Sequence, residues 1–273
     1  MIEKTHNTPC GVIHYWIYKN NNLNKSLVLL PGLGFDHRLY DEQVKYFKGK
    51  YNILVWDAPG HASSYPFQLN FGIMDDVQWL DEIITTEELI NPIIIGQSMG
   101  GYIAQAYLQN YPEKIKGFIS IDSGPLQKKY VNSFQLFLFR WIIGPVNRII
   151  PWNTKINLSI KNMTNSTQGE QLLRDFIKVY DEDHKRYADL SAHGMNIVAD
   201  AYEADLPYAI QCPALLICGE KDSSDFINQN NTWSKDTGIK LEMVENASHI
   251  SNVDKPEIVN SLIDNFLNTI KIN

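Results

Sequence analysis

The sequence predicts an α/β fold: a mainly parallel sheet with helices on both faces, plus an inserted helical cap. Two observations lead to this prediction. Short apolar runs that end in Gly-rich loops alternate along the chain with helical segments, which is the pattern of parallel strands joined by helical crossovers. One long stretch, residues 127 to 208, breaks the alternation because it has helical spacing and no convincing strand.

Seven apolar runs are predicted as strands, because each is short, rich in β-branched residues and followed by a turn or loop. The runs cover residues 11–18, 26–32, 51–60, 92–96, 117–125, 212–222 and 239–245. Helices are predicted between them where apolar residues recur at helical spacing, at residues 72–89, 98–111 and 256–270. Pro112 closes the second of these helices.

The order of these elements predicts two units. Residues 1–126 and 209–273 form the α/β core, and residues 127–208 form the helical cap inserted between two core strands. A chain of 273 residues suits one core with such an insertion.

Composition narrows the class of protein. The chain is 44% hydrophobic and 20% charged, as in a globular protein, and its net charge of -7 offers no basic surface for nucleic acid. Its three cysteines (Cys10, Cys212 and Cys218) cannot all pair and show no C-x-x-C spacing. We therefore expect neither a disulfide framework nor a zinc site, and a reducing compartment.

The N-terminal residues mix Glu, Lys, Asn and Pro and lack the apolar core of a signal peptide. The most apolar long segment, residues 134–152, is interrupted by Arg140, Arg148, Gly144 and two prolines. These interruptions argue against a helix that spans a membrane. We expect a cytoplasmic protein without stable membrane insertion.

Ser98 lies where a run of isoleucines, residues 93–95, gives way to a helical pattern. Gly96 and Gly100 flank it in the sequence GQSMG, and glycines allow a strand and a helix to approach closely at a sharp turn. G-x-S-x-G also occurs by chance, but the strand before it and the helix after it favour a nucleophile elbow. The N–H of Met99, at the start of that helix, is then a candidate oxyanion donor.

A second Gly-rich turn follows the run LVLL, in LLPGLGFD at residues 29–36. It could be an ordinary tight turn, but beside Ser98 it would present the N–H of Leu33 as the other oxyanion donor.

A serine nucleophile needs a base, and His249 lies in the loop after the last predicted strand. The other histidines precede Ser98 or fall in the cap. The acid that orients the histidine is expected between the two, and Asp222 ends a strand in GEKD. Asp225 in the same loop and Asp122 at the end of the preceding core strand remain alternatives.

With these residues assembled, the chain resembles the α/β-hydrolase fold superfamily over nearly its whole length. The resemblance is carried by five segments in the family's order: LPGLGFD, WDAPGHASS, GQSMGG, GEKD and ASHIS. Two positions depart from the family pattern. Pro31 stands where a histidine is common, and Ala62 stands where a second glycine is usual.

The resemblance implies a serine hydrolase that cleaves a small or medium ester, thioester or related carbonyl substrate without metal or cofactor. Ser98, Asp222 and His249 would be the catalytic residues, and Leu33 and Met99 would form the oxyanion hole. A serine at the elbow argues against the dehalogenase and epoxide hydrolase branches. The same residues also serve non-hydrolytic enzymes, such as lyases or C–C bond hydrolases, and ligand-binding signalling relatives with little turnover.

The cap is rich in aromatic residues, and we expect Phe134, Phe137 and Trp141 to contact the apolar portion of a small-molecule substrate. They could instead bury the cap against the core. Reversible membrane contact by this segment is a third interpretation, for which Arg140 and Arg148 are the evident basic residues.

Overall fold

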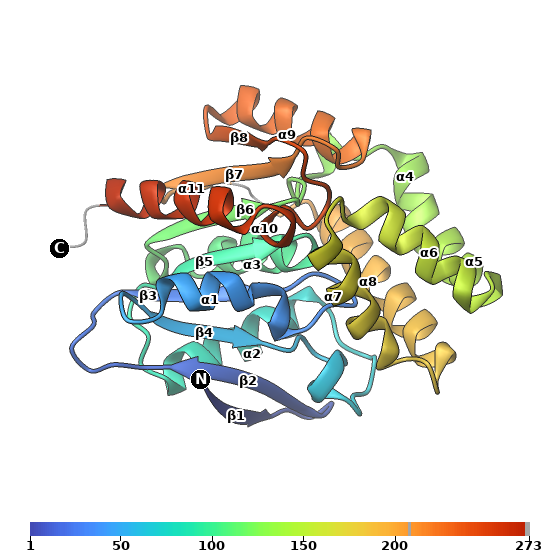
Figure 1. Ribbon diagram of the computed structural model, residues 1–273, viewed down its shortest axis with the longest axis horizontal. Helices are drawn as coiled ribbons and strands as arrows, with labels where there is room; N and C mark the ends of the chain where they lie inside the picture. Colours follow the sequence, from blue (N-terminus) through green and yellow to red (C-terminus); the bar gives the residue numbers. More distant parts are fainter. Residues whose placement is uncertain (207–208, 271–273) are drawn as a thin grey trace.

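A computed structural model describes residues 1–206 and 209–270. An eight-stranded sheet runs through its centre, in the order β1-β2-β4-β3-β5-β6-β7-β8 (Figure 1). The first two strands of this order are antiparallel to their neighbours, and the pairs from β4 to β8 are parallel. The strands are β1 (Ile2–Asn7), β2 (Val12–Tyr18), β3 (Ser26–Leu30), β4 (Asn52–Trp56), β5 (Ile93–Gln97), β6 (Gly117–Ile121), β7 (Ala214–Gly219) and β8 (Lys240–Val244).

The central strands are buried along their whole length, because helices cover both faces of the sheet. Every residue of β3, β4, β5 and β6 is buried, as expected for parallel strands that are apolar throughout. Short η1 (His37–Tyr40) leads into α1 (Asp41–Phe47), and α1, α10 (Ser251–Asp254) and α11 (Pro256–Thr269) share one apolar core with the sheet. On the other face lie α2 (Ile73–Thr86), α3 (Met99–Asn110) and α9 (Ser224–Thr237). The 3-10 turns η2 (Ala62–Ser64) and η3 (Pro112–Lys114) lie in loops.

The sequence-based prediction of the fold class is confirmed, but it missed β1. The strand has the polar sequence IEKTHN, and five of its six residues are exposed, so no apolar pattern marks it. It is held by antiparallel pairing with β2, from Ile2 opposite Ile17 to Asn7 opposite Val12. The sheet therefore extends one strand beyond the apolar runs.

Between β6 and β7 the described residues form helices and no strand. They are η4 (Lys128–Tyr130), α4 (Ser133–Phe137), η5, a π-helical turn (Leu138–Ile142), α5 (Ile143–Ile149), α6 (Trp152–Met163), α7 (Thr167–Lys178) and α8 (His184–Ala204). The division into core and cap at residues 127–208 stays a prediction, and residues 207–208 lie outside the described part of the chain.

This helical insertion lies beside the carboxyl ends of the parallel strands (Figure 1). The long helix α8 reaches the elbow, because the hydroxyl of Tyr202 donates to Tyr102 of α3 at 3.3 Å. Gly194 of α8 packs closely on Leu33, because a Cβ there would lie 2.7 Å from the Leu33 side chain. Ligands of open parallel sheets bind at this edge, and the insertion encloses it.

Candidate active site

Ser98 occupies a strained turn between β5 and α3, with φ of 49° and ψ of -117°. Non-glycine residues rarely adopt positive φ, and such strain is typical of functional sites. The turn is possible because neighbouring backbones touch: a Cβ on Gly100 would lie 2.0 Å from the carbonyl oxygen of Leu30, and one on Gly96 would lie 2.3 Å from that of Gly100. The two glycines therefore allow the sharp turn that presents the Ser98 side chain.

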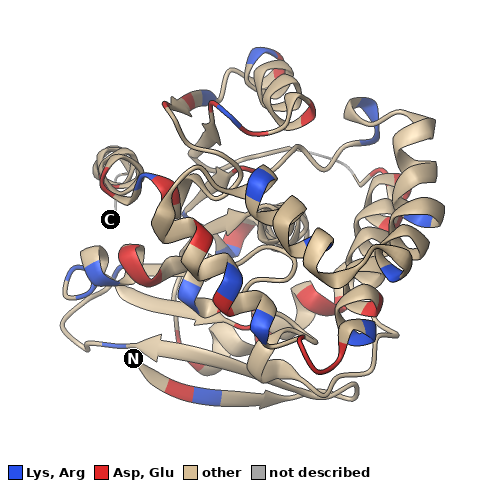
Figure 2. Cartoon of the chain, turned by 45° about the vertical axis from the view of Figure 1, so that its right-hand side comes forward, with Lys and Arg blue, Asp and Glu red and all other residues tan. Residues whose placement is uncertain are grey.

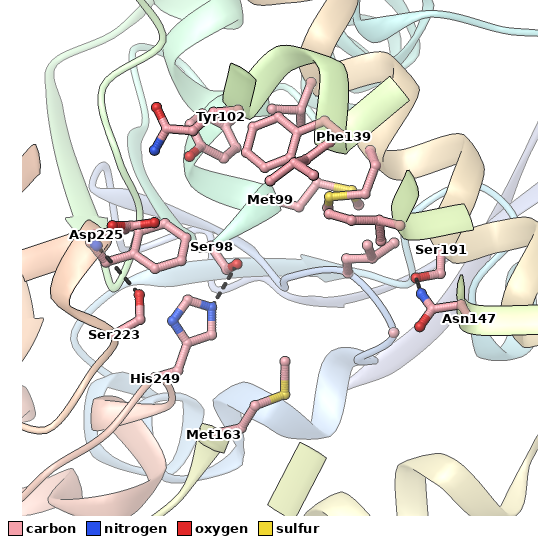
Figure 3. A pocket seen from close by; sticks show the side chains of 18 of the residues that line it. Ser98, Met99, Tyr102, Phe139, Asn147, Met163, Ser191, Ser223, Asp225 and His249 are labelled. Atoms are coloured by element: carbon pink, nitrogen blue, oxygen red, sulfur yellow. Dashed lines mark hydrogen bonds between the residues drawn. The ribbon is translucent and has the colours of Figure 1, made fainter. Parts of the chain in front are cut away.

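Three side chains from distant parts of the chain meet at this turn. His249 Nε2 lies 2.9 Å from Ser98 Oγ, and His249 Nδ1 lies 2.9 Å from Asp222 Oδ2. The first of these contacts is drawn as a dashed line in Figure 3. The side chains of His249 and Asp222 are 9% and 2% exposed, so water competes little for their hydrogen bond. The structure brings together the serine, histidine and aspartate that the sequence pointed to.

Burial and neighbouring carboxylates shift the pKa of the His249 imidazole in opposite directions. Burial lowers its pKa, but the charge of Asp222, the hydrogen bond to that carboxylate and the charge of Asp122 together outweigh burial, so the pKa lies above its ordinary value. A carboxylate beside a histidine stabilises the protonated ring. A ring with a raised pKa binds a proton more readily, as the predicted role of His249 as a base requires.

Asp122, which the sequence left open as an alternative to Asp222, is hydrogen-bonded to backbone groups and not to His249. Its Oδ1 accepts the N–H of Gly219 at 2.8 Å, and its Oδ2 accepts the N–H of Ser251 at 2.7 Å. The carboxylate thus joins the end of β7 to the segment after His249. Burial and the neighbouring charge of Asp222 raise its pKa well above the ordinary value. Asp225, the other alternative, lies exposed on α9 at the edge of the cavity.

Two further residues fix the histidine loop, and the sequence patterns did not reveal them. Gln97 donates from Nε2 to the carbonyl oxygen of His249 at 2.6 Å. Asp254 accepts the N–H of Ser248 at 2.9 Å and the N–H of Asn165 in the insertion at 2.9 Å. Gln97 lies inside the elbow motif, but its position between Gly96 and Ser98 gave no sign of a bond to a loop 152 residues away.

Leu33 and Met99, the predicted oxyanion donors, lie beside Ser98. Both residues line the cavity that contains Ser98 Oγ. The β3 turn approaches the elbow closely, since a Cβ on Gly32 would lie 3.0 Å from Ser98 Cβ. Within the described residues neither backbone N–H donates to another backbone group outside the helices and strands. This arrangement is consistent with the predicted oxyanion hole, which stays a prediction.

A cavity of about 650 Å³ opens above Ser98 and His249. This volume lies within the range of small-molecule sites. Its walls are mainly apolar, and Figure 3 shows Met99, Tyr102, Phe139 and Met163 around the reactive pair. Asn147 donates to Ser191 Oγ at 2.8 Å at one end of the cavity. Among the described lining residues there is no lysine or arginine.

The expectation that Phe134, Phe137 and Trp141 contact the substrate is wrong in this structure. Their side chains are 67%, 50% and 63% exposed, and none of them lines the cavity. The cavity is lined instead by Leu138, Phe139, Ile142 and Ile143 of the same helical run. The aromatic residues therefore pointed to the segment that lines the cavity, but not to the face of that segment that lines it.

Two clusters have donor atoms close enough together to hold a metal ion: Asp36, His37 and Asp57, and Asp122, Cys218 and Asp222. In each cluster the carboxylates already have partners. Asp36 binds Arg38 through both oxygens, Asp57 accepts from the His37 backbone, and Asp122 holds Gly219 and Ser251. Burial also raises the pKa of the Cys218 thiol, which opposes the thiolate form that binds metals. We assign no metal to either cluster.

Residues 25–256 match the sequence profile of the alpha/beta hydrolase fold. The chain belongs to the α/β-hydrolase fold family. Solved structures of this family superimpose on nearly the whole chain. An esterase from Thermogutta terrifontis is 18% identical, with a TM-score of 0.72 and coverage of 99% of both chains. A bromoperoxidase from Bacillus anthracis is 16% identical, with a TM-score of 0.72 and coverage of 98% of this chain and 100% of its own.

Curated α/β-hydrolase relatives cover most of the chain at low identity. An (E)-2-((N-methylformamido)methylene)succinate hydrolase from Acinetobacter baylyi is 23% identical over 92% of this chain and 94% of its own. A 3-oxoadipate enol-lactonase from the same organism is 22% identical over 88% and 87%. These relatives support a hydrolase at the level of the family.

Proposed function

We propose that this α/β-hydrolase is a serine hydrolase that cleaves an ester or thioester with an uncharged, apolar acyl group. The observation that carries the proposal is the continuous hydrogen-bonded chain from Ser98 through His249 to Asp222, beside an apolar cavity. This is the arrangement that activates a serine hydroxyl for attack on a carbonyl carbon.

In the first half of the reaction, Ser98 Oγ attacks the carbonyl carbon while its proton passes to His249 Nε2. Asp222 stabilises the imidazolium and holds Nδ1–H toward itself. The N–H groups of Leu33 and Met99 donate to the oxyanion. The tetrahedral intermediate then breaks its bond to the leaving group, which departs with the proton from His249, and an acyl-enzyme on Ser98 remains.

Water completes the cycle. His249 takes a proton from a water molecule as its oxygen attacks the acyl carbon, and the second tetrahedral intermediate releases the acid and returns the proton to Ser98 Oγ. Each step uses the same oxyanion donors and base.

The walls of the cavity favour an uncharged acyl group. No lysine or arginine lines the described cavity, and its one acidic residue, Asp225, would repel a carboxylate. The names of the two Acinetobacter relatives specify a succinate and a 3-oxoadipate derivative. We infer that this chain differs from them in substrate, because nothing in its cavity would neutralise a second carboxylate.

Labelling with a fluorophosphonate probe tests the nucleophile. Wild-type protein should label and hydrolyse p-nitrophenyl esters continuously, and Ser98→Ala should lose both properties. Ser191→Ala is the matched control, because Ser191 lines the same cavity but contacts Asn147. Absence of labelling in folded wild type would contradict the proposal and favour ligand binding without turnover.

A pair of esters tests the acyl group. p-Nitrophenyl butyrate should be cleaved with kcat/KM at least about tenfold above that of p-nitrophenyl hemisuccinate, because the buried carboxylate of the latter lacks a partner. Equal rates, or a preference for hemisuccinate, would contradict the assignment of an uncharged acyl group while leaving the serine mechanism standing.

A further inference from the structure

The cavity beside Ser98 has two chemically different sides. In Figure 3, Phe139 and Ser191 lie on one side of the paired side chains of Ser98 and His249. Asp225 lies on the opposite side of that pair. The first side belongs to the insertion, and the second is the start of α9. An ester or thioester also has two halves, an acyl group and a leaving group, so the two sides offer each half its own surroundings.

The side formed by the insertion is apolar. Leu138, Ile142 and Ile143 of the run from α4 to α5 line it. Although this part of the chain is rich in apolar residues, no helix among the described residues combines the length and apolar character needed to cross a membrane. The acyl group of the proposed reaction fits this side, because burial of its apolar surface against such side chains is favourable.

The side formed by α9 is polar. Asp225, Phe226 and Gln229 lie at positions i, i+1 and i+4 of this helix, and all three line the cavity. Residues i and i+4 of an α-helix share one face. Among the described residues, neither the Asp225 carboxylate nor the Gln229 amide has a hydrogen-bond or ion-pair partner. No bond within the described chain would therefore have to break for a ligand to contact them.

Charge distinguishes Asp225 from the rest of the lining. Charged residues of both signs, 24 basic and 31 acidic, are spread over the chain as a whole (Figure 2). Among the described lining residues, by contrast, Asp225 is the only Lys, Arg, Asp or Glu. A carboxylate without a counter-ion at the edge of a mainly apolar cavity attracts a cation and repels an anion. The attraction is modest, because Asp225 is exposed to water.

The position of His249 indicates which half of the substrate would lie at α9. In the proposed reaction the leaving group receives its proton from His249 Nε2, so it must lie beside that ring. The ring of Phe226 packs against the ring of His249, with centroids 4.7 Å apart. The leaving group would therefore extend along the start of α9, and the acyl group would lie on the side of the insertion.

We propose that the start of α9 is a leaving-group site for a positively charged alcohol or thiol, such as one with a quaternary ammonium group. The Asp225 carboxylate and the Gln229 amide oxygen would lie near the positive charge. Phe226 would present the face of its ring, since aromatic rings attract quaternary ammonium ions. This inference rests on the proposed hydrolase function.

The chemistry of the acylation step is unchanged. The bond between the carbonyl carbon and the leaving oxygen or sulfur breaks, and that atom keeps the bonding electrons. It takes the proton from His249 Nε2 and departs as a hydroxyl or thiol, while the acyl group stays on Ser98 Oγ. The cationic part of the leaving group takes no part in the bond changes, so its charge affects only how the substrate is held.

Two thioesters with the same acyl group and nearly the same shape test the site. Butyrylthiocholine carries a quaternary nitrogen, and S-(3,3-dimethylbutyl) thiobutyrate has a neutral carbon in its place. Wild type should cleave the cationic thioester with kcat/KM about fivefold or more above that of the neutral one, because an exposed ion pair and a cation–π contact together supply about that factor. Asp225→Asn should lower the ratio to about twofold or less, and Asp225→Lys should reverse the preference.

Glu182→Gln is the matched control, because Glu182 is exposed, does not line the cavity and loses the same single charge. Asp225 also lies in the first turn of α9, where a negative charge stabilises a helix. Both substrates are measured on one preparation, so any loss of folded protein cancels from the ratio. Three results would overturn the proposal: no wild-type preference for the cation, an unchanged ratio in Asp225→Asn, or an equal fall of the ratio in Glu182→Gln.

Binding to Ser98→Ala separates this site from the hydrolase function. Cleavage of neither thioester by wild type would contradict the hydrolase function, but Ser98→Ala forms no acyl-enzyme, so calorimetry on it measures the Kd of each intact thioester. Tighter binding of the cationic thioester, lost when Asp225→Asn is added, would support the site even without hydrolysis. Equal binding of the two thioesters to Ser98→Ala would overturn it.

Discussion

At the scale of single residues, the site depends on the protonation of His249 and on the hydrogen bonds of two buried aspartates. In the proposed mechanism His249 must be neutral to accept the proton of Ser98. Asp222 lies against its other ring nitrogen at 2.9 Å. Asp122, one hydrogen bond away from the same loop, carries a second carboxylate into the buried region. These two acids have different partners, so their removal should have different effects.

The first prediction concerns pH. Burial lowers the pKa of His249, but Asp222 and Asp122 raise it by more, so the pKa lies above its ordinary value. Since the protonated ring is inactive as a base, kcat/KM should rise with pH through a limb whose midpoint lies above about 6.5. Asp222→Asn should move the limb to lower pH and reduce kcat by roughly 10⁴-fold. A limb that does not move in the variant would contradict the role of Asp222.

The second prediction concerns Asp122. Asp122→Asn replaces an acceptor oxygen by an NH₂ group, so the N–H of Gly219 or of Ser251 loses its partner. The variant should be less stable by about 1 to 3 kcal/mol in urea unfolding. Its kcat should fall far less than that of Asp222→Asn. The opposite order of activities would exchange the roles of the two acids.

At the scale of elements, the elbow depends on the absence of side chains where β3, β5 and α3 meet. Gly100→Ala would place a Cβ 2.0 Å from the Leu30 carbonyl oxygen, and backbone must move to relieve the clash. We expect a loss of about 3 kcal/mol or more in chemical denaturation. Gly238→Ala is the control: φ is +74° there but no atom lies within 4 Å, so strain alone should cost about 1 kcal/mol. Similar losses in both variants would contradict the close packing at the elbow.

The elements also show what the sequence could predict. The buried strands and the helix after Ser98 were predictable because their apolar patterns reflect burial on both faces. β1 was not, because its six residues are held by pairing and not by burial. The face of the run from 133 to 149 was not predictable either, since a π turn at Leu138–Ile142 shifts the helical register and both faces are apolar.

Likewise, the positions of Ser98 and His249 could be inferred from turns and chain order, whereas the anchors Gln97 and Asp254 could not. Their bonds join segments that are 152 and 89 residues apart. Such contacts leave no local pattern, because neither residue type nor spacing marks a partner so distant in sequence.

At the scale of the whole molecule, a small space between core and insertion collects buried titratable groups. It is lined by His61 after β4, Asp76 of α2 and His193 of α8. Each has a buried side-chain atom without a hydrogen-bond partner among the described residues. Burial, and then the charge of His61, lower the pKa of His193 to about 4 despite the opposing charge of Asp200. The packing of α8 on the core should therefore depend on pH.

The direction of this pH dependence follows from the difference between the pKa of His193 in the folded and in the unfolded chain. His193 is neutral when folded, and the unfolded chain binds a proton below about 6.5, so its share of stability is present above that pH and is lost as pH falls toward 4. His193→Asn should lose less stability than wild type between pH 7 and pH 5, by about 1 to 2 kcal/mol, in urea unfolding. His184→Asn is the control, because His184 is an exposed histidine of the same helix. An unchanged pH dependence in His193→Asn would contradict this account.

The separation of 151 positions from Ser98 to His249 also bears on how the protein is made. Translation of that interval takes roughly 8 to 30 s at ordinary rates of synthesis. During this time the proposed nucleophile is part of a nascent chain that still lacks His249, its proposed base. Each molecule therefore gains its proposed reactivity only after the histidine loop emerges, and truncated translation products that stop before this loop should lack that reactivity.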